Sequence, residues 1–319
     1  MAGSWTTYLG AAHGVLSAAK LTDLSLMEMA GMTGMAFHLY MHKHCDAAAV
    51  TVYDWVGRHQ SALDRIGVLS ETYHYEPGSR TYEPAKKRAA FNIKNAIDQG
   101  TGVVAWAIDT GEFGIIYGYD DEDGVFLVDG VDRFNRPLGS DPMLYENIGM
   151  KFPPAPFVHY QIPLASVAFN REQTYIDSLT FYVHEMKKGY HMSPDFQSGF
   201  LAYDIWVHSL KNDTYNPFGL RYCTIVYAEA KCFAAEYMQY LAADWGGLKG
   251  MHDVAGNFKQ VAVIYRSMMD ALEQSWDGGG DLGKKVTTDQ AKQLIPYLQQ
   301  AKELEYEAVK QLEENKEIK

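Results

Sequence analysis

The sequence predicts an α+β fold, with a mixed first domain at residues 1–165 and a helical second domain at 166–319. Runs of β-branched and aromatic residues, which are typical of strands, gather between residues 103 and 162. From Asn170 onward the pattern changes to long helical periodicities, with Pro and Gly at their junctions. A chain of 319 residues with 47% hydrophobic content is sufficient for two packed cores.

The first domain should begin with a buried helix. Small and apolar residues recur at helical spacing over Thr7–Ala19, with Ser4, Thr6 or Thr7 available as the cap. Further helices are expected over 24–29, 52–66 and 85–98, the last of them closed by Gly100. Strands are expected over 103–108, 113–119, 125–128 and 157–162, with an acidic hairpin turn at 120–124.

The second domain should be helical. Helices are expected over 175–188, 200–210, 221–243 and 258–276, followed by a glycine-rich loop at 276–287. The final helix begins at a capping box formed by Thr287 and Gln290, and Pro296 should kink it. Its long apolar stripe could pack on its own domain or on a partner, so a homo-oligomer is one expectation.

The charge balance argues against two classes of partner. The 28 basic and 40 acidic residues give a net charge of −12, which disfavours nucleic acid and anionic membranes. The first ten residues lack a signal-peptide pattern, and no apolar run approaches the ~20 residues of a membrane span. The three cysteines, Cys45, Cys223 and Cys232, show no disulfide-framework spacing. We therefore expect a cytoplasmic protein without a cofactor.

The order of elements over residues 85–130 is a helix, a Gly, a strand, a second strand that runs into Gly-Tyr-Asp, and a third that ends in Asp. That order resembles the bacteriocin-processing peptidase-like branch of the papain superfamily, and more closely the family of the butirosin biosynthesis protein H N-terminal domain. Residues 3–37 are similar to that family's opening segment. The resemblance covers the first half of the chain and implies a papain-like, cysteine-proteinase-type first domain.

The resemblance also implies where the site lies. In that family the first helix carries a nucleophilic cysteine, a histidine opens the Gly-Tyr strand, and an Asp or Asn ends the next strand. Here Asp129 falls at the position of the orienting acid, Glu112 at that of the histidine, and Thr7 or Tyr8 at that of the nucleophile. A papain-type site needs a thiolate stabilised by an imidazolium at a helix N-terminus. Glu112 is therefore expected to be a buried, hydrogen-bonded carboxylate or a ligand-binding group rather than a base.

One cysteine in the first domain offers a different nucleophile. Cys45 follows two histidines in the segment His42-Lys43-His44-Cys45-Asp46 and precedes a helical-looking stretch, a setting that activates thiols. A lone cysteine is also a common small buried residue. His38 and His42 would share one face of a helix, with His44 close behind, so a metal site is a further alternative.

Two functions remain open. One is a binding protein without chemistry that holds a small metabolite or peptide at the former active site. Trp5, Thr7 and Tyr8 would contact the ligand there, with His191 supplied by the second domain. The alternative is an acyltransferase, amidase or peptidase-like enzyme that acts on an amide or thioester. Its catalytic residues would be drawn from Cys45, Glu112 and Asp129.

Overall fold

The computed structural model describes residues 3–188, 193–276 and 282–318. It shows mixed helix and sheet, with an antiparallel sheet in the first half and helices towards the C-terminus, which confirms the α+β class. The chain divides into two compact units, Met1–Leu26 with Asp54–Phe169, and Met27–Tyr53 with Asn170–Lys319. The boundary expected at residue 165 lies close to Phe169, whereas residues 27–53 belong to the second unit and not to the first.

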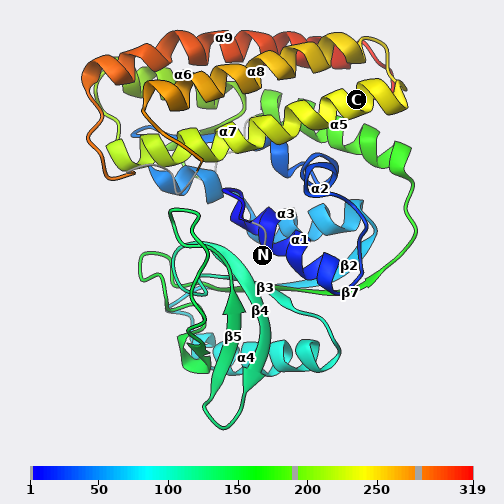
Figure 1. Cartoon of the computed structure of the whole chain (residues 1–319), viewed down its shortest axis with the longest axis vertical. Helices are drawn as coiled ribbons and strands as arrows, with labels where there is room; N and C mark the ends of the chain where they lie inside the picture. Colours follow the sequence, from blue (N-terminus) through cyan, green and yellow to red (C-terminus); the bar gives the residue numbers. More distant parts are fainter. Residues whose placement is uncertain (1–2, 189–192, 277–281, 319) are drawn as a thin grey trace. The chain divides into compact units, whose positions relative to one another are not determined.

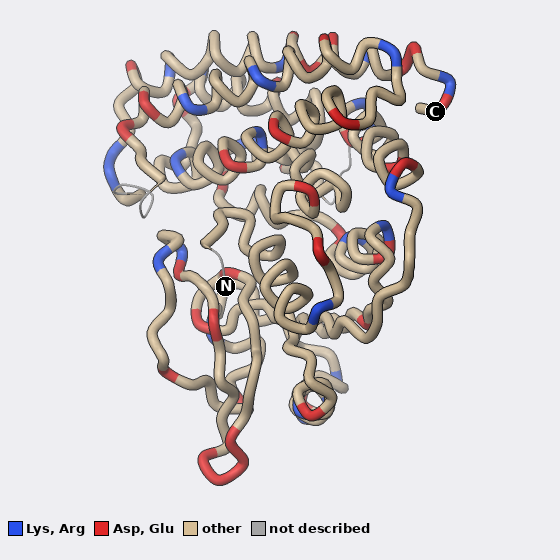
Figure 2. The backbone as a smooth tube through the Cα atoms, turned by 45° about the vertical axis from the view of Figure 1, so that its right-hand side comes forward, with Lys and Arg blue, Asp and Glu red and all other residues tan. Residues whose placement is uncertain are grey.

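The first unit is built on a six-stranded sheet with the order β2-β7-β3-β4-β5-β6, and every neighbouring pair is antiparallel (Figure 1). Its strands are β2 (Val68–Tyr75), β3 (Val103–Trp106), β4 (Phe113–Asp120), β5 (Val125–Asp129), β6 (Met143–Leu144) and β7 (Val158–Ser166). The expected hairpin joins β4 to β5, and its acidic turn is the red loop in Figure 2.

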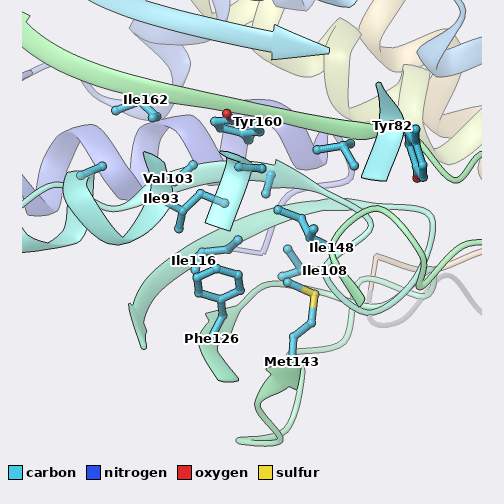
Figure 3. Close-up of a cluster of buried hydrophobic side chains, with 14 residues drawn as sticks. Tyr82, Ile93, Val103, Ile108, Ile116, Phe126, Met143, Ile148, Tyr160 and Ile162 are labelled. Atoms are coloured by element: carbon cyan, nitrogen blue, oxygen red, sulfur yellow. The ribbon is translucent and has the colours of Figure 1, made fainter. Parts of the chain in front are cut away.

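Helices lie on both faces of this sheet. Helix α4 (Tyr82–Asp98) packs Ala89, Ile93 and Ala96 into a core with alternate residues of the central strands (Figure 3). The strand residues that point to the other face of the sheet pack against α1 (Thr7–Ala18) and α3 (Trp55–Arg65). For example, Trp106 on β3 lies 4.8 Å from the ring of Trp55. The face that carries α1 and α3 is the one that carries the candidate site.

The second unit is mainly helical. Its elements are α2 (Leu26–Met32), β1 (Tyr40–His42), α5 (Arg171–Lys188), β8 (Phe196–Ser198), α6 (Phe200–Lys211), α7 (Pro217–Tyr240), α8 (Met251–Ala271) and α9 (Thr288–Glu313), with short helical turns at Met35–Phe37, Ala47–Thr51 and Leu241–Trp245. The capping box of Thr287 and Gln290 is present, and Pro296 lies inside α9. Within the described ranges, no helix combines the length and the apolarity needed to cross a membrane.

Contacts distant in sequence hold residues 27–53 in the second unit. Strand β1 pairs with β8, and the Tyr227 hydroxyl bonds both backbone groups of Tyr40. Gly31 lies flat against the ring of Tyr237, where an added Cβ would come within 2.1 Å of ring carbon. Only glycine permits this approach, so the position of α2 depends on Gly31.

A buried ion pair crosslinks the helices of this unit. Lys231 on α7 lies 2.7 Å from Glu305 on α9, and both side chains are almost fully buried. Tyr203 on α6 donates a hydrogen bond to the same carboxylate, and Tyr265 on α8 donates to Tyr203. The apolar stripe of α9 is buried beside this network, against α6 and α8 of its own unit. The homo-oligomer expected from that stripe stays a prediction.

Candidate functional site

Thr7 and Glu112 form the centre of the candidate site. Thr7 is the first residue of α1, and its hydroxyl donates to Glu112 Oε2 at 3.0 Å. The same hydroxyl accepts the backbone N–H of Phe113 at 3.1 Å. The two side chains are 7% and 6% exposed. The positions that the family resemblance assigns to the nucleophile and the base are therefore in direct contact in the first unit.

Local backbone structure fixes Glu112 at this place. The backbone oxygen of Glu112 accepts from Ala107 N–H at 2.9 Å, which closes the loop between β3 and β4 next to the Trp106–Phe113 strand pair. The N-terminal end of a helix carries a partial positive charge that stabilises a nearby carboxylate. The start of α1 therefore supplies both a hydrogen-bond donor and a favourable field to Glu112.

Tyr8 extends the site into a buried polar network. Its hydroxyl donates to Gln161 Oε1 at 2.7 Å, and its ring stacks on that of His59 with centroids 3.6 Å apart. The Gln161 amide nitrogen donates to the His59 carbonyl and to the Ser70 hydroxyl, each at 3.0 Å. Satisfied buried networks of this kind fix side-chain orientation, because every broken bond leaves a polar group unpaired.

Three histidines continue the network in a row. His59 Nδ1 lies 3.0 Å from His159 Nε2, and His159 Nδ1 lies 3.3 Å from His74 Nδ1. At the outer end, His74 Nε2 lies 3.9 Å from the carboxylate of Glu76. The middle ring engages both of its nitrogens, so a neutral His159 donates through one and accepts through the other. The three rings thus form a hydrogen-bonded chain on the face of the sheet that carries α1 and α3.

Burial lowers the pKa of two of these histidines. Loss of hydration on burial, with a smaller contribution from the neighbouring His74, lowers the pKa of His159 to about 3. Burial also lowers the pKa of His74, although Glu76 and Asp54 oppose that shift. His159, the middle ring of the row, therefore carries no charge at neutral pH.

The sequence did not predict this histidine chain. Its members come from α3, β2 and β7, far apart along the chain, and no short motif joins them. One signal was present, because His159 and Gln161 alternate with the apolar residues of β7, whose Val158, Tyr160 and Ile162 face the α4 core. A repeated polar residue on the second face of a buried strand indicates a polar layer.

Cys45 lies in the second unit, not with Glu112 and Asp129 in the first. Its side chain is fully buried, and burial raises the pKa of the thiol from 9.0 to about 12. Its backbone carbonyl packs against Gly219 at the start of α7. The segment that follows is a single 3-10 turn capped by Asp46. These are the properties of a small buried residue rather than of an activated thiol.

His38 and His42 do not share a helix, contrary to the expectation from their spacing. His38 ends a 3-10 turn and stacks on Tyr53, whereas His42 belongs to strand β1. His44 Nδ1 contacts the carbonyl of Thr214 at 2.9 Å. In the part of the chain that the structure describes, no group of three His, Cys, Asp or Glu side chains is arranged to hold a metal ion.

The remaining predicted residues have mixed outcomes. Asp129 ends β5 as expected and pairs with Ile115 of β4, so it lies on the strand next to the one that Glu112 precedes. Trp5 is buried just before α1. His191 lies outside the described residues.

Comparison with known protein families and with curated proteins finds no match to this chain.

We predict that iodoacetamide labels Cys45 very slowly. At pH 8 the rate should be roughly 1,000-fold below that of the urea-unfolded chain, because three pH units separate a pKa of about 12 from the ordinary 9.0. Peptide mass spectrometry after timed labelling measures the rate, with the half-buried Cys232 as internal reference. Fast labelling of Cys45 near pH 6 would show an activated thiol and contradict this assignment.

We also predict that the first unit loses stability in mild acid. The folded state keeps His159 neutral down to a pKa of about 3, whereas the unfolded chain takes up its proton near 6.5. Stability is therefore complete above pH 6.5 and falls as the pH drops towards 3, by about 2 kcal/mol between pH 6.5 and 5 from His159 alone.

Urea titrations at several pH values measure this dependence. The slope of unfolding free energy against pH reports how many protons the chain takes up on unfolding. In His159→Leu that number should fall by about one, whatever the effect of the substitution on absolute stability. His252→Gln, at an exposed histidine of the second unit, is the matched control and should leave the slope unchanged. An unaltered slope in His159→Leu would show that His159 is not the group responsible.

Proposed function

We propose that this protein has a papain-like first domain, similar to the butirosin biosynthesis protein H family, and binds a small metabolite or peptide at the former active site without cleaving it. The observation that carries the proposal is the bond between Thr7 and Glu112. By the family resemblance, the Thr7 hydroxyl and the Glu112 carboxylate fall at the positions of the thiol and the imidazole, and the hydroxyl donates a hydrogen bond to the carboxylate.

The cysteine inventory supports the same proposal. All three cysteines of the sequence belong to the second unit, so the first unit contains no thiol at all. Without a thiolate the positions of Glu112 and Asp129 cannot perform papain-type acyl transfer. The buried site retains its directional polar groups, which are the features that give a ligand site its selectivity.

The chemistry of the site favours a ligand that donates hydrogen bonds. The carboxylate oxygens of Glu112 are hydrogen-bond acceptors, so they suit an amine, an amide N–H or the N-terminus of a peptide. Tyr8 and Phe113, whose rings lie 5.5 Å apart, add aromatic faces that attract cations. Because Thr7 and Glu112 are buried, a ligand must displace side chains that cover them, and a conformational change should accompany binding.

The proposal is tested with a panel of small amines, amides and dipeptides, screened by thermal shift and confirmed by calorimetry. For any compound that binds, Glu112→Gln should weaken affinity at least about 10-fold, because an amide NH₂, which cannot accept a hydrogen bond, replaces one acceptor oxygen. Glu146→Gln, in the 3-10 turn after β6, is the matched control and should have no effect. Equal affinity in Glu112→Gln and in the unchanged protein would place the ligand elsewhere.

One observation favours the enzymatic alternative. The Thr7 hydroxyl and the Glu112 carboxylate lie within the distance at which a general base activates a nucleophile. In that reaction Thr7 Oγ1 would bond the carbonyl carbon of an amide or thioester and pass its proton to Glu112. The departing amine or thiol would then take up that proton. Water would later hydrolyse the threonine ester.

The two functions differ in what Thr7 does to an acyl donor. An enzyme predicts that the intact protein, incubated with an acyl thioester, gains the mass of one acyl group at Thr7, and that Thr7→Val abolishes this gain. The binding proposal predicts no acylation of Thr7 and no turnover, with ligand affinity retained in Thr7→Ser. Acylation mapped to Thr7 would overturn the binding proposal in favour of the enzyme.

A further inference from the structure

Helix α4 of the first unit presents one face to the sheet and the opposite face to solvent (Figure 1). The residues of its outer face recur at helical spacing and are all exposed, namely Pro84, Lys87, Phe91, Asn95 and Asp98, here called the α4 stripe. Phe91 lies in the middle of the α4 stripe and is 51% exposed. Aromatic side chains bury a large area when a partner covers them and are enriched in protein interfaces. The α4 stripe is therefore a candidate contact surface.

The α4 stripe is basic on one side of Phe91 and acidic on the other. Lys87 lies one turn before Phe91, and the neighbouring Arg88 places its guanidinium carbon 5.0 Å from the centre of the Phe91 ring. Asp98 lies two turns after Phe91, at the end of the helix. Neither Lys87 nor Asp98 forms an ion pair with any residue that the structure describes. Each copy of the chain thus carries one unpaired charge of each sign on the same helix face.

The acidic hairpin turn between β4 and β5 adds negative charge at the same end of α4. The Tyr119 hydroxyl donates to Asp98 Oδ1 at 2.7 Å, and Lys94 Nζ lies 2.8 Å from Asp121 Oδ1. These two contacts hold the turn at 120–124, the red loop in Figure 2, beside the last two turns of α4. The other acids at the tip of the turn are exposed. The C-terminal half of α4 is therefore acidic, although Lys94 belongs to it.

A second copy of the same surface complements this charge pattern when the two helices run in opposite directions. With a rise of about 1.5 Å per residue, Lys87 lies about 6 Å before Phe91, and Lys94, which marks the hairpin turn, lies about 4.5 Å after it. A two-fold axis at Phe91 therefore brings the basic turn of each helix level with the acidic half of the other. It also packs one Phe91 ring against its counterpart. A parallel pair would instead place Lys87 against Lys87, and like charges in contact are unfavourable.

We propose that this chain forms a two-fold symmetric dimer in which the α4 stripes of two copies pack antiparallel. Phe91 of each copy contacts its counterpart on the axis, and Lys87 of each copy pairs with Asp98 of the other. A surface that complements itself in this way is what an isologous interface requires. One helix pair and two hairpin turns make a small interface, so the dissociation constant should be about 10–100 μM. This surface is separate from the site at Thr7 and does not depend on the function proposed for it.

The test is sedimentation equilibrium of the full chain at low salt, from about 5 μM to about 1 mM, where the monomer should give way to a dimer. Phe91→Ser should weaken association at least about 10-fold, because the two rings lose their contact. Lys87→Glu and Asp98→Lys should each weaken it several-fold, because each places like charges together. The double variant should restore association, because it forms the same pair with the charges exchanged. Thermal unfolding checks that each variant is folded.

Tyr306→Ser is the matched control, since Tyr306 is an exposed aromatic residue of α9, the helix that the sequence suggested for an oligomer. This variant should associate like the unchanged protein. Three results would overturn the proposal. They are a monomer at every concentration up to about 1 mM, unchanged association in Phe91→Ser, and a charge-exchanged double variant that associates no better than the single variants. Association lost in Tyr306→Ser and kept in Phe91→Ser would place the interface on α9 instead.

Discussion

The hydrogen bond from Thr7 to Glu112 is the constraint on which the rest of the candidate site depends. It joins the first turn of α1 to the residue just before β4, more than a hundred positions later in the chain. A buried carboxylate without donors is costly, and a buried hydroxyl needs partners as well. Thr7 meets both needs, because it donates to Glu112 and accepts from Phe113. Its removal leaves both groups without that partner.

The next residue of α1 connects this bond to a second polar layer. Tyr8 follows Thr7 and reaches Gln161 with its hydroxyl and His59 with its ring. Two successive residues of one helix therefore fix α1 on the sheet through separate networks. The result is a buried polar layer whose side chains are held in fixed orientations, next to the buried carboxylate of Glu112. Such an interior suits selective binding and offers no thiolate for acyl transfer.

Local signals made much of the fold predictable from the sequence. The helix that ends at Asp98, just before Gly100, the hairpin at 120–124 and the capping box at Thr287 each depend on a few adjacent residues, and all are present. Strand β2 was missed, because its polar middle gains strand character only by pairing with β7. The placement of residues 27–53 was missed for the same reason, since Gly31 fits Tyr237 only in the folded unit. The resemblance indicated Thr7 and Glu112, but no local pattern could place His59, His74 and His159 in one row.

The most direct test of this account is the coupling free energy between Thr7 and Glu112. It is obtained by urea unfolding of the unchanged protein, Thr7→Val, Glu112→Gln and the double variant. If the bond holds α1 to the sheet, the double variant should lose about 1–3 kcal/mol less than the sum of the single losses. Additive losses, within about 0.5 kcal/mol, would show that the two side chains do not stabilise one another and would contradict the account.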